Sequence, residues 1–351
     1  MARYKKRIIS QSAMPGLFDE FETQPASIEE LPLHPSIVRH ATQVRLTGGS
    51  PRVAETTDEP VVEPVELVAT DSDIYFMSFG SGSSGNCAYV GDDESGFLID
   101  AGVDADKVTA ALKRWGIPMS RIKGIILTHD HGDHIRDAYK LLRSNKHMLL
   151  YCTPRAFNGM LRRHNVSRRI KDYHKAIYKE IPFAVGKFRI TAFEVSHDGT
   201  DNAGFFIEHG DQRITVATDL GCIGDRADFY MSQSHYLMIE SNYDYQMLRN
   251  GHYPEYLKAR IAANNGHLDN VVTAQQVRKL ASLGHLRYVF LCHLSRDNNT
   301  PEIALTAVRQ ALLEAGVTVG DASDSLESRQ AQVQLMALPR YDATRLFRLH
   351  L

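Results

Sequence analysis

One short segment of the chain gathers four side chains that can bind metal ions. The sequence Thr128-His-Asp-His-Gly-Asp-His134 follows a run of apolar residues. Its possible ligands are His129, His131, Asp133 and His134. Imidazole nitrogens and carboxylate oxygens suit zinc, manganese or iron. A single His-x-His pair more often belongs to a solvated turn, but four such groups after an apolar strand predict a metal site.

The same segment can serve two neighbouring ions. His129 and His131 fall on one side of an extended turn, because successive side chains alternate there. Asp133 and His134 then reach a second position from the start of a helix. Two ions ~3.5–4 Å apart can hold a water molecule between them and lower its pKa towards ~7. The segment therefore predicts a hydrolase, in which Asp133 also orients the nucleophile.

Further donors stand at the ends of apolar runs elsewhere in the chain. They are His197 in Val195-Ser-His-Asp198, Asp219 in Ala217-Thr-Asp-Leu-Gly221, and His293 in Leu291-Cys-His-Leu294. Asp100 ends the similar run Phe97-Leu-Ile-Asp100. Each is a weak signal alone, because a single His or Asp at a strand end is more often structural.

Alternating strand and helix patterns position these residues. Strands are predicted at 74–79, 87–90, 96–100, 124–128, 188–195, 203–208, 213–218, 235–240, 288–292, 331–337 and 344–349. Helices are predicted at 104–115, 133–144, 155–163, 254–264, 273–283 and 302–314. This mixed order predicts an α/β layered domain over residues 71–351. Residues 1–70 hold seven of the thirteen prolines and predict a flexible or loosely docked extension.

Composition limits the class of protein. The net charge of −2 gives no global indication of nucleic-acid or membrane binding. The four widely spaced cysteines predict reduced thiols rather than a disulfide framework. The chain has no apolar run near the ~20 residues that span a bilayer, and no signal-peptide pattern. We therefore expect a cytoplasmic protein that does not bind membranes.

His-x-His-x-Asp-His resembles the signature of the metallo-β-lactamase superfamily, and the resemblance extends from Asp73 to Leu351. It implies an αββα sandwich of two mixed sheets with helices on the outer faces. It also implies two divalent metal ions, with zinc or manganese favoured and iron a third choice. The implied ligands of the first are His129, His131 and His197, and those of the second are Asp133, His134 and His293. Asp219 would bind both ions, and Asp100 would support a ligand histidine.

Three other motifs resemble the YycJ/WalJ group of this superfamily. They are Ser78-Phe-Gly-Ser-Gly-Ser-Ser-Gly-Asn86, Gly266-His-Leu-Asp-Asn270 and Cys292-His-Leu-Ser-Arg-Asp-Asn-Asn299. Members of the group are described as DNA exonucleases acting from the 5′ end. Asp269 departs from the serine that is usual there. The resemblance suggests that Ser83, Ser84, Asn86 and Asn298 hold substrate, and that His267 binds the phosphate or protonates the leaving oxygen.

A local basic segment supports a polyanionic substrate. Arg162, Arg163, Arg168 and Arg169 lie in a stretch without acidic residues, and phosphate contacts supply most non-specific nucleic-acid affinity. We predict a 5′ to 3′ exonuclease that acts on DNA in preference to RNA, in DNA repair or maintenance. The alternatives are a phosphodiesterase of small molecules or cyclic nucleotides, an RNA-processing nuclease, and a metal-bound scaffold without turnover. The patch Met14-Pro-Gly-Leu-Phe18 is a candidate contact for a partner protein.

Overall fold

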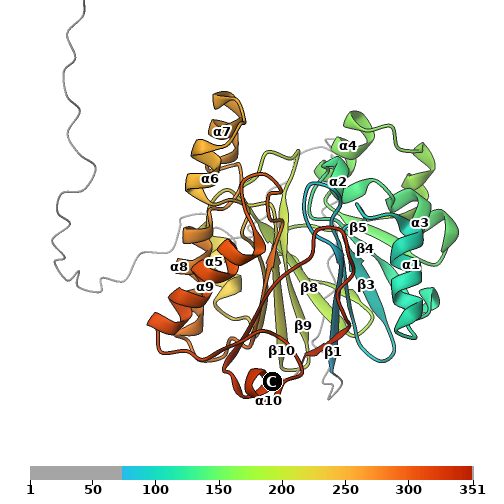
Figure 1. Cartoon of the computed structure of the whole chain (residues 1–351). Helices are drawn as coiled ribbons and strands as arrows, with labels where there is room; N and C mark the ends of the chain where they lie inside the picture. Colours follow the sequence, from blue (N-terminus) through green and yellow to red (C-terminus); the bar gives the residue numbers. More distant parts are fainter. Residues whose placement is uncertain (1–72, 350–351) are drawn as a thin grey trace, which may run out of the picture. The chain divides into compact units, whose positions relative to one another are not determined.

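The structure of the protein is a computed structural model that describes residues 73–349 (Figure 1). The predicted extension, residues 1–70, and the apolar patch at Met14–Phe18 lie outside the described residues. Among residues 73–349, no helix combines the length and apolar character needed to cross a membrane. The four cysteines are unpaired, and only Cys222 is not fully buried.

Seven strands form the first sheet, in the order β15-β1-β2-β3-β4-β5-β6. They are β1 (Ile74–Gly80), β2 (Cys87–Gly91), β3 (Gly96–Ile99), β4 (Ile122–Ile126), β5 (Leu149–Cys152), β6 (His174–Ala176) and β15 (Phe347–Leu349). Strands β3 to β6 are parallel. The pairs β15–β1, β1–β2 and β2–β3 are antiparallel. The sheet is therefore mixed.

Eight strands form the second sheet, in the order β13-β14-β12-β11-β10-β9-β8-β7. They are β7 (Phe183–Val185), β8 (Phe188–Glu194), β9 (Ala203–His209), β10 (Gln212–Ala217), β11 (Tyr236–Glu240), β12 (Tyr288–Cys292), β13 (Val319–Gly320) and β14 (Val333–Ala337). Strands β10, β11, β12 and β14 are parallel. The hairpins β7–β8, β8–β9 and β9–β10 are antiparallel. Because β8 and β10 both pair antiparallel with β9, they run in the same direction.

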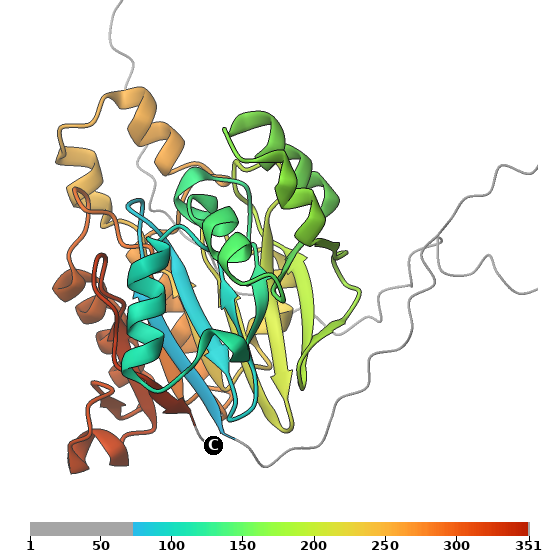
Figure 2. The ribbon, with the colours of Figure 1, turned by 90° about the vertical axis from the view of Figure 1, so that its right-hand side faces the viewer.

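Helices cover the outer face of each sheet (Figures 1 and 2). The first sheet is covered by α1 (Ala105–Arg114), α3 (Ala138–Ser144) and α4 (Pro154–Arg163). The second is covered by α5 (Asp225–Met231), α8 (Asn270–Ala281) and α9 (Pro301–Glu314). Shorter helices are α2 (Gly132–Ile135), α6 (Tyr245–Asn250), α7 (Glu255–Ile261) and α10 (Leu326–Gln330), with 3-10 turns at Met119–Arg121 and Arg168–Tyr173. This arrangement confirms the predicted αββα sandwich.

The main core lies between the two sheets. In β11, Tyr236 and Met238 point into this layer, whereas Leu237 and Ile239 point towards the helices. Both faces of the strand are buried, as period-two alternation in a covered sheet requires. Across the layer, Phe76 of β1 stacks on Phe290 of β12, with ring centroids 4.4 Å apart. This pair joins the sheet that carries the His-x-His segment to the sheet that carries Asp219 and His293.

Replacing Phe290 with alanine is expected to lower the free energy of unfolding by about 3–5 kcal/mol, because the ring is buried and leaves a cavity between the sheets. Urea unfolding followed by circular dichroism measures this change. Phe229→Ala is a matched control, since that ring is 51% exposed, and its cost should stay within about 1 kcal/mol. Equal losses in the two variants would contradict the packing of Phe290 between the sheets.

The predicted elements differ from the structure in three ways. The helix predicted over 133–144 is two helices, α2 and α3, because the amide of Asp137 bonds to the carbonyl of Ala101 at 2.9 Å instead of continuing the turn. The helix predicted from Thr273 begins three residues earlier, since Asp269 caps it through the amide of Val271. Asp269 is therefore the N-cap of α8. Serine, the residue that is usual at this position, is an equally good N-cap. Strands β5, β6, β7 and β13 and helices α5, α6 and α10 were not predicted, since most are too short to show a period.

Candidate metal centre

The predicted ligands come together because their strands end at the same edge of the sandwich. Asp100 follows β3, and the His129–His134 segment follows β4. His197, Asp219 and His293 follow β8, β10 and β12, which run in one direction. The carboxyl ends of such strands form the usual ligand edge of an open α/β sheet. All seven predicted ligands therefore meet in one place.

Three histidines form the first group. One ring nitrogen from each of His129, His131 and His197 lies within 4.8 Å of the other two. The Nδ1 of His131 is 3.3 Å from the Nε2 of His197. The Nδ1 of His197 is directed instead at the carbonyl of Gly266, at 2.9 Å. Burial and neighbouring imidazoles hold the pKa of His129 well below its usual range, so this ring keeps a free lone pair.

Asp133, His134 and His293 form the second group, again within 4.8 Å. The Nδ1 of His134 lies 2.7 Å from Asp100, which leaves Nε2 facing Asp133 at 3.6 Å. The Nε2 of His293 is 3.5 Å from Asp133. Thr128 completes the support, since its backbone amide donates to Asp100 at 2.9 Å. Asp100 thus occupies the supporting position that the sequence predicts for it.

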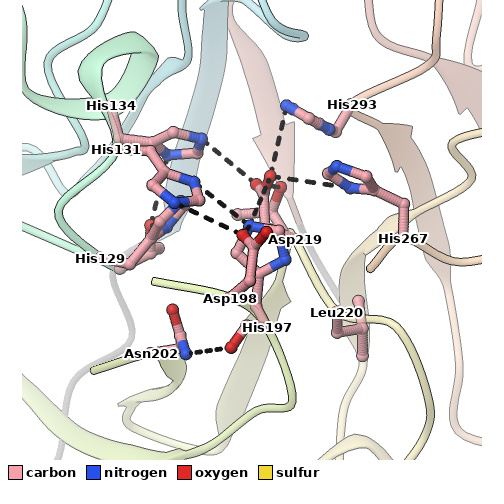
Figure 3. A network of polar contacts seen from close by, with 12 residues as sticks. His129, His131, His134, His197, Asp198, Asn202, Asp219, Leu220, His267 and His293 are labelled. Carbon is pink, nitrogen blue, oxygen red and sulfur yellow. Dashed lines mark hydrogen bonds and ion pairs between the residues drawn. The ribbon is translucent and has the colours of Figure 1, made fainter. Parts of the chain in front are cut away.

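Asp219 lies between the two groups (Figure 3). Its carboxylate is 3.2 Å from the Nε2 of His134 and 3.3 Å from the Nε2 of His293. It is also 3.8 Å from the Nε2 of His197, which belongs to the first group. Burial would raise the pKa of Asp219, but His293 and His134 hold it well below its usual range. An ionised carboxylate in this place can bind two cations at once.

The residues present fit two divalent ions. The Nε2 atoms of His129 and His293 are buried and have no hydrogen-bond partner among the described residues. Asp100, Asp219 and Glu240 are buried carboxylates, and buried negative charge requires nearby positive charge. Burial would lower the pKa of His293, but the adjacent carboxylates of Asp219, Asp133 and Glu240 outweigh it and raise this pKa to about 10. Divalent ions bound here would supply the same compensation, and the free Nε2 atoms of His129 and His293 are available to bind them.

Three residues of the centre have a positive φ angle, a backbone conformation that residues other than glycine rarely adopt. The φ angles of Asp100, Asp219 and His293 are 59°, 52° and 52°. Each such residue costs of order ~1–3 kcal/mol and persists only where the surrounding structure enforces it. Asp100 and His293 directly follow the last residue of a strand, Asp219 comes two residues after one, and each turns its side chain back into the centre. Neither composition nor hydrophobic period reveals this feature.

The glycine- and serine-rich loop between β1 and β2 packs against the centre. The Oγ of Ser81 accepts the backbone amide of His293 at 2.8 Å. The Nδ2 of Asn86 donates to Asp133 at 3.1 Å, and its Oδ1 accepts the amide of Gly82 at 2.7 Å. Position 102 requires glycine for the backbone to approach Asp133 this closely, because a Cβ there would lie 1.5 Å from the backbone carbonyl oxygen of Asp133. Asn86 is therefore buried under the ligands, whereas Ser83 is exposed and Ser84 half-buried.

His267 lies at the rim of the centre, with 22% of its side chain exposed. Its ring stacks on His293 with centroids 5.2 Å apart, and its Nδ1 is 3.9 Å from Asp219. The same Nδ1 is 2.7 Å from the buried Glu240. Burial would lower the pKa of His267, but Glu240 outweighs this effect and raises it. Glu240 also lies 3.0 Å from the Nδ1 of His293, so one carboxylate orients both rings.

Sequence reasoning gave no role in the site to Glu240, Asp198 and Asp130. Glu240 ends β11 at the same edge as the ligands, a position that could have identified it. Asp198 is adjacent to His197 and lies 3.5 Å from the Nε2 of His131. Asp130, within the His-x-His segment, is turned away and accepts the hydroxyl of Thr200 at 2.6 Å. It thereby fixes the loop that carries His197.

Two cavities open beside the centre and share Ser83. One of about 210 Å³ is lined by residues of the ligand loops and of α7, including His197, Asp198, Arg260, His267 and His293. The other, of about 420 Å³, is lined by Asp133, Arg136, His164 and their neighbours. A larger cavity of about 820 Å³ lies at the opposite ends of the strands, around Asp73, Tyr288 and Phe347. It contains none of the predicted ligands, so the two smaller cavities are the ones that matter for chemistry.

The basic segment borders the second cavity. His164, which follows α4 as its C-cap, lies beside Gly132, with 3.7 Å between its ring and the position of a Cβ there. Arg162, Arg163, Arg168 and Arg169 are all exposed. Arg163 is 3.9 Å from Asp130, and within residues 73–349 the other three have no carboxylate partner. Asn298, by contrast, is buried and its carbonyl accepts the amide of Asp244 at 2.8 Å, while Arg296 is exposed.

Comparison with known proteins agrees with this geometry. Residues 96–294 match the model of the β-lactamase superfamily domain. The exodeoxyribonuclease YycJ of Bacillus anthracis is 31% identical over 250 residues, which cover 71% of this chain and 93% of that protein. The exodeoxyribonuclease WalJ of Streptococcus pneumoniae is 31% identical over 249 residues, which cover 70% and 90%.

Two solved structures share the fold at low sequence identity. The metallo-β-lactamase fold protein YhfI of Bacillus subtilis superposes with a TM-score of 0.55 at 13% identity, over 78% of this chain and 99% of that one. A diphosphatase of the PhnP family gives 0.52 at 16% identity, over 79% and 98%. At such identities they show the fold alone. The chain belongs to the metallo-β-lactamase superfamily, as a metal-dependent hydrolase of the YycJ-like kind.

Proposed function

We propose that this hydrolase is a DNA exonuclease that degrades strands from the 5′ end, in the cytoplasm, and serves DNA repair or maintenance. One observation supports a polymer substrate above all: residues 164–166 line the cavity that contains Asp133 and lie in the sequence between the exposed pairs Arg162–Arg163 and Arg168–Arg169. Hydrolysis of a small phosphodiester would need the metal ligands but not the basic segment around these arginines. Both curated relatives carry the name exodeoxyribonuclease, which favours DNA over RNA.

The chemistry follows from the positions of the side chains. Two divalent ions, for which we propose zinc or manganese before iron, would supply a water nucleophile and neutralise phosphate charge. Asp133 is only partly buried and would orient that nucleophile. His267 stands on the other side of Asp219, where Glu240 fixes its ring. We assign it the protonation of the leaving oxygen, while Ser83, which lines both cavities, would contact phosphate oxygens. The hydroxyl of Ser84 is buried, so we propose no phosphate contact for it.

Cleavage of end-labelled polymers tests the proposal. Single- and double-stranded DNA and RNA, labelled at either the 5′ or the 3′ end, are incubated with the protein and Mn²⁺ or Zn²⁺. Mononucleotides released first from the 5′ end of DNA are expected, and His131→Ala should abolish them, which excludes a contaminating nuclease. Cleavage of RNA alone, or of only a small phosphodiester, would reject the DNA assignment and leave the metal centre standing.

Reversing three charges of the basic segment should separate polymer from small-substrate hydrolysis. Arg162→Glu, Arg168→Glu and Arg169→Glu together are expected to raise the KM for DNA by ~10- to 100-fold at low salt and to flatten its salt dependence. Hydrolysis of bis(p-nitrophenyl) phosphate should stay within about twofold, because these arginines do not touch the ligands. Steady-state kinetics with both substrates measures the ratio.

The matched control reverses the same number of charges on α1, at Lys107, Lys113 and Arg114. These side chains are exposed on the outer face of the first sheet. DNA hydrolysis by this variant should remain close to that of the wild type. If the two triple variants lose DNA affinity equally, the effect belongs to net charge and the segment has no specific part in binding.

A further inference from the structure

Most ligand histidines have a fixed partner on the ring nitrogen that faces away from the centre. His134 is held by Asp100 at 2.7 Å, and His293 by Glu240 at 3.0 Å. His197 is held by the carbonyl of Gly266 at 2.9 Å. Such outer partners orient the ring, select the tautomer and raise the affinity of the ligand for metal.

His131 is partly exposed, with 27% of its side chain accessible, and has no such hydrogen bond among the described residues. Its Nδ1 is the nitrogen that faces the group, since it lies 3.3 Å from the Nε2 of His197. The outer nitrogen of His131 is therefore Nε2. The nearest carboxylate oxygen to it is the Oδ1 of Asp198, at 3.5 Å.

Asp198 presents this oxygen in an unusual way. Its Oδ1 is buried and has no hydrogen-bond partner among the described residues. It points between His131 and His197, 3.5 Å from the Nε2 of each (Figure 3). An unpaired buried carboxylate oxygen is costly unless a donor or cation faces it. The Nε2–H of His131 is the donor within reach.

Arg260 of α7 fixes the other oxygen of Asp198. Its Nε and Nη2 lie 2.8 and 2.6 Å from Oδ2. Two contacts to one oxygen fix the orientation of the carboxylate, so Oδ1 stays directed at the histidines. Arg260 also lines the smaller cavity together with Asp198 and His267. The position of α7 over the centre is thereby linked to the orientation of a ligand.

We propose that Asp198 is a positioning residue that orients His131 through its outer nitrogen, and that Arg260 holds Asp198 in place from α7. The first metal position then depends on a contact made by the wall of the substrate cavity. This inference rests on the metal centre of the proposed function and is independent of its nucleic-acid substrate.

Zinc titration of the full-length, metal-depleted protein against a chromophoric chelator tests the inference without any substrate. Asp198→Ala is expected to weaken one of two zinc sites by ~10- to 100-fold, the usual cost of losing an outer partner. The second site should change by less than about threefold. Asp198→Asn should restore most of the affinity, because its amide oxygen still accepts the N–H. Arg260→Ala should give an intermediate loss, and the exposed Asp342→Ala provides the control.

Three results would overturn the inference. The first is wild-type zinc affinity at both sites in Asp198→Ala and Arg260→Ala alike. The second is a changed set of visible absorption bands in cobalt-substituted Asp198→Asn, because an altered coordination shell would make Asp198 a direct ligand. The third is a wild-type chain that binds fewer than two zinc ions, which would reject the metal centre as well. Failure to cleave DNA, by contrast, would reject the proposed function and leave this inference standing. Arg260→Ala keeps the test valid if Asp198→Ala does not fold, since the Arg260 side chain is 63% exposed.

Discussion

Substitution of Asp219 by alanine is expected to remove bound metal and to reduce hydrolysis of every substrate by several orders of magnitude. The carboxylate lies 3.2–3.8 Å from ligand nitrogens of both groups, so its loss weakens two sites at once. Without the ions the pKa of the attacking water rises from near ~7 to that of bulk water. Elemental analysis after gel filtration should find fewer than one ion per chain, against two in the wild type.

Asp342→Ala serves as the control for this variant, because Asp342 is an exposed carboxylate with no ion pair or hydrogen bond to the described residues. Near-ultraviolet circular dichroism should show that the sandwich remains folded, since the sheets are joined by an apolar core rather than by the ions. Retention of two ions and of more than about a tenth of the wild-type rate by Asp219→Ala would show that the two groups do not share this ligand.

His267→Ala is expected to lower turnover of DNA by ~10²- to 10⁴-fold while both ions stay bound, because the ring is proposed as proton donor and not as ligand. Its effect should depend on the leaving group. An alkoxide leaving group, as in DNA, needs a proton, whereas p-nitrophenolate leaves without one. Hydrolysis of bis(p-nitrophenyl) phosphate should therefore fall far less than hydrolysis of DNA.

His285→Ala is a suitable comparison, since this histidine bonds to the carbonyl of Ser232 on the far side of the second sheet. It should leave both rates unchanged. Equal losses on the two substrates by His267→Ala would contradict a role in protonation. Loss of one ion from His267→Ala would instead show that His267 is a metal ligand. Its ring is close enough to Asp219, Glu240 and His293 to share an ion with them.

Sequence patterns predicted the longer elements well because each repeats a period over several residues. Strand β1, predicted at 74–79, is Ile74–Gly80, and helix α9, predicted at 302–314, is Pro301–Glu314. Elements of three to six residues, such as β6, β7 and α6, are too short to show a period. The break between α2 and α3 was invisible for another reason: it is made by the contact of Asp137 with Ala101, which are distant in sequence.

The sequence by itself determined the chemistry of this protein. Four donors within six residues predicted a metal site from residue types alone, and the resemblance that they carry extended this prediction to two ions and to single donors at three later strand ends. Only the tertiary structure decided which residues support those donors. Glu240 became part of the centre because β11 ends between β10 and β12. Asn86 and Asn298, predicted to contact substrate, are buried by packing around the ligand loops. The reason is physical: a ligand type is a property of one side chain, whereas an outer partner is defined by contacts between strands that the chain order does not place together.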